Sequence, residues 1–86
     1  MACYVTSVRH GGRDERLRIL VLITGRGYAV LDVSDDSPDV REGDEVIGIP
    51  LSRGECVVRV EKREVTFRAF NQGIFSRSDA ETLPYR

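Results

Sequence analysis

Few residues in this chain have the types and spacing that catalysis requires. General acid and base chemistry at neutral pH usually employs histidine, and the single histidine, His10, stands in a glycine turn, with no serine beside a suitable base. Asp35 and Asp36 form an adjacent pair of carboxylates, which in a turn stay ionised and cap the backbone. Cys3 and Cys56 fall in strand-like runs, where thiols pack as small apolar groups. With one histidine and no CxxC pair, we expect no metal site, no cofactor and no enzyme.

A spaced set of arginines and acids is the sharper pattern. Residues 9–13 read RxxxR and residues 32–37 read DxSxxS. Together they resemble the signature of the PilZ domain family, RxxxR followed by [D/N]xSxxG, which that family carries on a six-stranded barrel. The resemblance implies a receptor for a cyclic dinucleotide such as cyclic di-GMP, in which arginines grip phosphates and guanines and the acid and serine contact a guanine. The residues that would take these roles are Arg9, Arg13, Asp32 and Ser34.

Charge is spread unevenly along the chain, which bears on a third option, a barrel that binds single-stranded nucleic acid. Bases outnumber acids up to residue 31, whereas acids outnumber bases over residues 32–64. Such asymmetry can steer a charged partner to one face. The sequence pI is nevertheless about 5.8, tryptophan is absent and aromatic residues make up 7% of the chain, so the footprint of a nucleic-acid binder is missing.

The elements that must position these residues have the two-residue period of strands. At 86 residues one domain is expected, and 41% hydrophobic content is typical of a globular chain. Short apolar runs separated by glycine-rich turns predict an all-β fold, a small six-stranded antiparallel barrel of the size of PilZ, SH3 or OB domains. The strands are expected over residues 2–9, 17–24, 28–33, 45–51, 55–61 and 65–70.

Two apolar faces on the second strand give the main functional hint. We expect Leu17, Ile19, Val21 and Ile23 to face the barrel interior, together with Ile47, Ile49, Leu51 and Val58, and Val40 to plug one end. Leu20 and Leu22 would then form a second apolar face, which the C-terminal tail or a second copy of the chain must cover. The residues expected at a partner interface are Arg16, Arg18, Leu20, Leu22, Asp35 and Asp36.

The C-terminal segment differs from the rest of the chain. We expect a barrel domain over residues 1–73 and a tail over residues 74–86 that packs on it. Ser78 to Glu81 has the pattern of a capping box, and Pro84 ends any helix after one or two turns.

These patterns favour a non-catalytic binding or regulatory module that acts through protein–protein contact, with the chain itself as one possible partner. The cyclic-dinucleotide receptor and the nucleic-acid-binding barrel are the alternatives. The sequence has no secretory pattern at its start and no apolar run of the roughly 20 residues that cross a bilayer, so we expect a cytoplasmic protein without a membrane partner.

Overall fold

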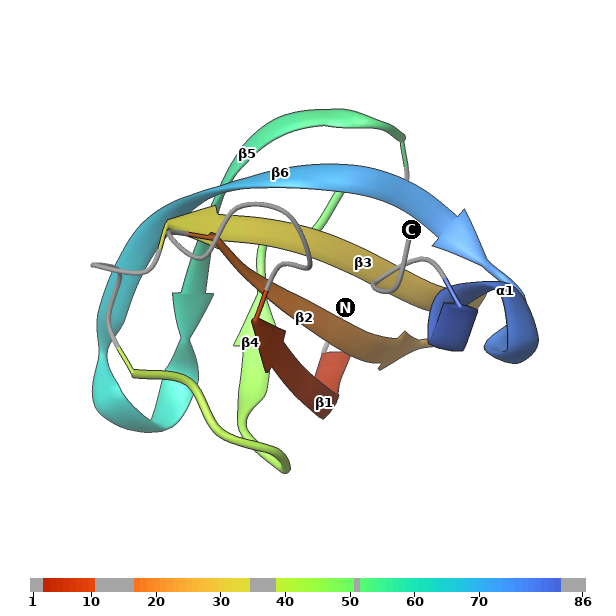
Figure 1. Cartoon of the computed structure of the whole chain (residues 1–86). Coiled ribbons are helices and arrows are strands. Elements are labelled where there is room, and N and C mark those ends of the chain that lie inside the picture. Colours follow the sequence, from red (N-terminus) through yellow and green to blue (C-terminus); the bar gives the residue numbers. More distant parts are fainter. Residues whose placement is uncertain (1–2, 11–16, 35–38, 51, 83–86) are drawn as a thin grey trace.

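The chain forms a closed antiparallel barrel, which confirms the predicted fold class. The computed structural model describes residues 3–10, 17–34, 39–50 and 52–82. The strands follow the order β1-β2-β3-β6-β5-β4, and β4 pairs with β1 to close the barrel (Figure 1). Their bounds are β1 Cys3–His10, β2 Leu17–Thr24, β3 Gly27–Ser34, β4 Glu45–Ile47, β5 Gly54–Val60 and β6 Val65–Phe75. A 3-10 turn, η1 (Glu61–Arg63), precedes β6, and a short helix, α1 (Arg77–Thr82), follows it.

The short strand β4 is the link that closes the barrel. Its Val46 pairs with Cys3 at the start of β1 and with Val60 at the end of β5. The loop before β4 continues the pairing, because the backbone N–H of Val5 donates to the carbonyl of Asp44 at 3.0 Å. The same loop buries Val40 in the core, as predicted, so that it closes one end of the barrel.

The interior is filled by alternate residues of the strands. The buried core comprises Cys3, Val5, Leu20, Leu22, Leu31, Val33, Val40, Val46, Val58, Val60, Phe67 and Ala69. The alternation predicted for β5 and β6 is confirmed at these positions. The prediction for β2 was wrong, since Leu20 and Leu22 are 0% exposed inside the barrel, while Ile19, Val21 and Ile23 face outward. All five residues from Ile19 to Ile23 are apolar, so the alternation carried no information about which face is inside.

A second, smaller cluster lies on the outside of β2 and β3. Ile19, Val21 and Val30 are buried there beneath Ala80 of α1, and Tyr28 and Phe75 pack around them. The chain's own C-terminal helix therefore covers the second apolar face of β2, although that face is the one opposite to the prediction. The hydroxyl of Ser76 accepts a hydrogen bond from the N–H of Asp79 at 3.3 Å, so the cap lies two residues before the predicted Ser78.

The stretch after β4 departs from the predicted alternation. The prediction that Ile47 faces inward was wrong, because its neighbour Val46 is the buried residue. Gly48 follows with a φ of +91° and changes the phase of the chain, so that Ile49 packs against the core as expected. The strand ends at Ile47, before the predicted residue 51, and Leu51 lies outside the described residues.

Asn71 in β6 ties the β4–β5 connection to the barrel. It is fully buried, and its side-chain amide donates to the carbonyls of Pro50, at 2.8 Å, and of Ser52, at 3.1 Å. Its side-chain oxygen accepts the N–H of Gly73 at 3.0 Å. Strand β6 then continues to Phe75, so the predicted boundary at residue 73 falls inside a strand.

Candidate binding surface

The register brings Arg9 of the RxxxR motif and Asp32 of the DxSxxS motif onto the same outer face. Arg9 pairs with Ile19, which pairs with Asp32 on the next strand. Asp32 pairs in turn with Phe70, and Phe70 with Glu55. These five residues alternate with residues of the core and therefore point outward. We call this line across five strands the charged row.

Arg9 and Asp32 lie on this face on strands that are not neighbours. One strand separates them, which places their backbones about 9.5 Å apart, with Ile19 between them. Each is engaged locally, since the Nε of Arg9 donates to the hydroxyl of Ser7 at 2.9 Å and Asp32 accepts from the amide of Gln72 at 2.7 Å.

The remaining residues of the two predicted sites divide into three groups. Ser34 is exposed at the end of β3, and its carbonyl accepts from the guanidinium of Arg18 at 3.4 Å. Arg18 itself is 7% exposed, and Leu20 and Leu22 belong to the core, so the prediction that these leucines form a partner interface was wrong. The predicted site residues that lie outside the described part of the chain are Arg13, Arg16, Asp35 and Asp36.

A second line of side chains on the outer surface is apolar. Tyr4 pairs with Ile23, Ile23 with Tyr28, and Tyr28 with Phe75. We call these four residues the apolar row. Tyr4 is 48% exposed and Ile23 is 41% exposed, while Tyr28 and Phe75 are half-buried. Sequence reasoning missed this row because it had assigned Ile23 to the interior.

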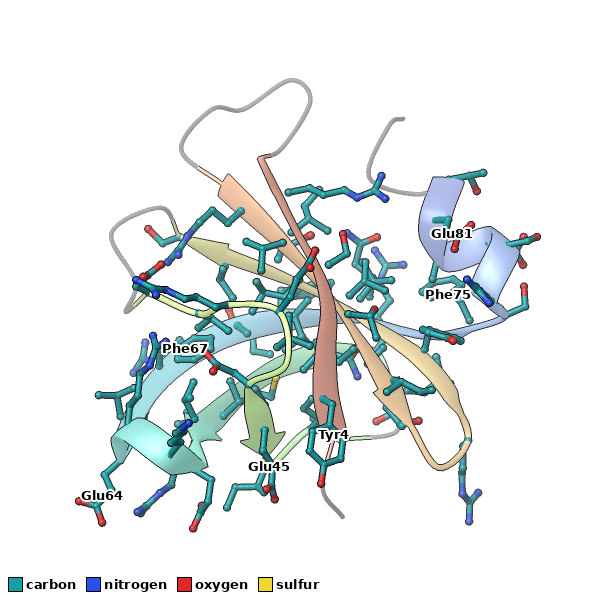
Figure 2. The ribbon with its side chains drawn as sticks, turned by 90° about the horizontal axis from the view of Figure 1, so that it is seen from below. Tyr4, Glu45, Glu64, Phe67, Phe75 and Glu81 are labelled. Carbon is teal, nitrogen blue, oxygen red and sulfur yellow. The ribbon has the colours of Figure 1, made fainter. Side chains whose placement is uncertain are left out.

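The two ends of the apolar row carry opposite charges. Glu45 pairs with Tyr4, and Figure 2 shows these two side chains pointing the same way, away from the barrel. Beyond Phe75 at the other end, α1 begins with Arg77, whose side chain is 77% exposed. The row therefore runs from an acid at one end to a base at the other.

Three hollows lie beside these rows. One of about 400 Å³ adjoins the charged row and is lined by Asp32, Glu55, Cys56, Val57, Arg68, Ala69 and Phe70. The guanidinium carbon of Arg53 lies over the ring of Phe70, 5.5 Å from its centre. A second, of about 280 Å³, lies between α1 and the outer face and is lined by Thr6, Ser7, Arg9, Val21, Tyr28, Arg77 and Glu81. A third, of about 490 Å³, has the lining Tyr4, Glu42, Gly43, Asp44, Glu45, Glu61 and Lys62.

The two cysteines offer little chemistry. Both are free, and burial raises the pKa of the Cys3 thiol and of the Cys56 thiol, the latter against a smaller opposing effect of a hydrogen bond from the Asn71 backbone. A thiol with a raised pKa is a poor nucleophile at neutral pH. Among the residues that the structure describes, no three histidine, cysteine or acidic side chains are grouped as metal ligands would be.

Comparisons of the chain with models of known protein families, with curated proteins and with solved structures gave no match. Within the described segments, no helix has the length and apolar character to span a membrane. The described surface thus offers two candidate contact features, the apolar row with its charged ends and the donor-rich hollow between α1 and the barrel.

Proposed function

We propose that this protein is a non-catalytic binding module that acts through protein–protein contact, with the apolar row as its contact surface and a second copy of the chain as the occupant. The observation that carries the proposal is the exposure of Tyr4 and Ile23, side by side on neighbouring strands, at 48% and 41%. Exposed aromatic and aliphatic side chains that adjoin one another are typical of interaction surfaces.

The distribution of charge favours a second copy as the occupant. A two-fold axis through the middle of the apolar row would set the acidic end of one copy against the basic end of the other. Glu45 would then approach Arg77 of the second copy, while Ile23 of each copy would meet Tyr28 of the other. In such an isologous contact the same patch of each copy binds the patch of the other, so the assembly closes as a dimer. The apolar row has four residues, far fewer than the roughly 20–30 residues that each partner contributes to a standard interface, so we expect a weak dimer.

Sedimentation velocity over a range of concentrations tests this proposal. Wild type should pass from monomer to dimer between about 5 μM and about 500 μM, a range that brackets the Kd expected of a small interface. Ile23→Lys places a charge in the centre of the row and should weaken the dimer at least about tenfold, because an unpaired charge would be buried. Val57→Lys is the matched control, since Val57 is 61% exposed on β5 outside the row, and it should leave the dimer unchanged.

A charge exchange tests the two-fold arrangement itself. Glu45→Arg and Arg77→Glu should each weaken the dimer, and the double variant should restore it, because the pair is then re-formed with its signs reversed. A wild type that stays monomeric over the whole range would overturn self-association. A dimer that tolerates Ile23→Lys, or that loses as much with Val57→Lys, would overturn the assignment to the apolar row.

A cyclic-dinucleotide receptor is the second candidate function. It is favoured because Arg9 and Asp32 lie on the same outer face of the barrel, in the charged row. Arginine offers a planar fork that matches phosphate oxygens. Titration calorimetry with cyclic di-GMP should then show heat for wild type and none for Arg9→Ala. Arg41→Ala serves as the control, since Arg41 is exposed and paired with Asp39 in the loop before β4. The absence of heat in wild type would reject this candidate.

A further inference from the structure

The hollow of about 280 Å³ between the barrel and α1 is lined mostly by hydrogen-bond donors. Its walls come from β1, β2, β3 and α1, and Figure 2 shows α1, with Glu81, standing beside the strands at the end near Phe75. The volume lies at the lower limit of small-molecule sites, which is about 300 Å³. A compact group fits such a space better than a whole nucleotide does.

An irregularity in β1 explains why one strand supplies three polar residues to this hollow. The pairing of β1 with β2 shifts between Val5 and Ser7, as in a β-bulge. A bulge sets two successive residues on the same side of the strand, so Thr6 and Ser7 both line the hollow. Arg9 follows two positions later and lies on the same side. The bulge thereby gathers two hydroxyls and a guanidinium at one place.

Helix α1 brings the second guanidinium. Arg77 lines the hollow and forms an ion pair with Glu81, one turn later, with 3.2 Å between its Nε and the carboxylate oxygen. The lining thus holds two positive charges and one negative charge, with three hydroxyls from Thr6, Ser7 and Tyr28. The side chains of Arg77 and Glu81 are 77% and 55% exposed, and exposed pairs of this kind are weak.

We propose that this hollow binds a phosphoryl group between Arg9 and Arg77, and that the Glu81 carboxylate occupies Arg77 until the phosphoryl group displaces it. A phosphate has the negative charge and the pairs of oxygen acceptors that the planar fork of a guanidinium group recognises. The Ser7 hydroxyl, which already accepts from Arg9 at 2.9 Å, holds that guanidinium in place and can donate its own proton to the ligand. This inference goes beyond the proposed function, because it does not need a second copy, although Tyr28 of the apolar row lines the hollow and Arg77 serves both proposals.

Inorganic phosphate is the probe that tests the site. Amide spectra of the ¹⁵N-labelled chain are followed while phosphate rises to about 20 mM at constant ionic strength, which holds charge screening fixed. Shifts should be confined to β1 around Ser7 and Arg9 and to α1, with a Kd near about 1 mM. Arg77→Gln should weaken binding about tenfold, whereas Glu81→Gln should tighten it about threefold, because Arg77 is released from its carboxylate.

Arg77→Gln and Glu81→Gln should change the affinity for phosphate in opposite directions, which distinguishes a defined site from a general attraction of anions to the protein surface. Arg41→Gln removes an exposed, paired arginine elsewhere and should change nothing. The same titration with cyclic di-GMP distinguishes a free phosphate from a phosphodiester, and saturable binding of either at these residues supports the site. The proposal is overturned if neither probe shifts them, if Glu81→Gln weakens binding, or if Arg41→Gln has the effect of Arg77→Gln. The titration is repeated on Ile23→Lys, whose dimer should be weakened at least about tenfold, so that failure of the dimer and failure of phosphate binding are distinguished.

Discussion

Truncation of two neighbouring residues of β2 tests which face of this strand is inside. Leu22 is 0% exposed in the barrel core, and Ile23 is 41% exposed on the apolar row. Removing a fully buried leucine side chain costs about 3–5 kcal/mol, because transfer free energy is lost and a cavity remains. Ile23→Ala removes a side chain that keeps much of its contact with water, so we expect a loss of less than about 1 kcal/mol.

The magnitude is large against the stability of the whole chain. At about 0.05–0.15 kcal/mol per residue, 86 residues give roughly 4–13 kcal/mol. With a urea m-value of about 1–1.5 kcal/mol/M for a chain of this size, Leu22→Ala should lower the urea midpoint by about 2–5 M. The corresponding change for Ile23→Ala should be below about 1 M.

Equilibrium unfolding in urea, followed by far-ultraviolet circular dichroism, measures both variants under the same conditions. It is run at a protein concentration below the dimer range, so that loss of self-association by Ile23→Ala does not enter the stability. If Ile23→Ala costs as much stability as Leu22→Ala or more, Ile23 is the residue inside the barrel, which is the orientation of β2 that the sequence predicted. A Leu22→Ala chain that does not fold, beside an Ile23→Ala chain that does, agrees with the structure.

Three further perturbations have defined outcomes. Asn71→Ala leaves two backbone carbonyls without their donor in a buried place, and urea unfolding should show a loss of about 2–4 kcal/mol. Gly27→Ala should lower the thermal midpoint by several degrees, about 4–8 °C per kcal/mol, since Gly27 has a φ of +140° and a Cβ there would lie 2.9 Å from Ile74 Cγ2. Burial raises the pKa of the Cys3 and Cys56 thiols above 9.0. The neutral thiols therefore contribute fully to stability below that pH, and this contribution is lost as the pH rises through the pKa values of the folded protein. Urea midpoints measured from pH 7 to 10 should fall accordingly.

The sequence predicted best where polar and apolar residues alternate cleanly. On β5, Glu55, Val57 and Arg59 point outward while Val58 and Val60 fill the core, as the two-residue period required. The strand β2 was harder because both of its faces are buried, one in the barrel and one under α1. A period of two cannot orient a strand whose every residue from 19 to 23 is apolar, and the partner of each face lies far away in the sequence.

The residues that meet on the candidate surface are set by the register between strands, which could not be predicted from the sequence. The resemblance to the PilZ signature pointed to Arg9 and Asp32 as site residues. Only the pairing of β1, β2 and β3 places them on one face, with Ile19 between them. Arg77 carried no signal in the sequence at all, since it enters the hollow through the docking of α1 against β3 and β6. A one-residue slip at the bulge beside Thr6 would turn Arg9 to the other side of β1 and separate it from Arg77. The bulge is therefore as much a part of the proposed phosphoryl site as the two arginines, and a variant that straightens β1 should lose phosphate binding while both arginines remain.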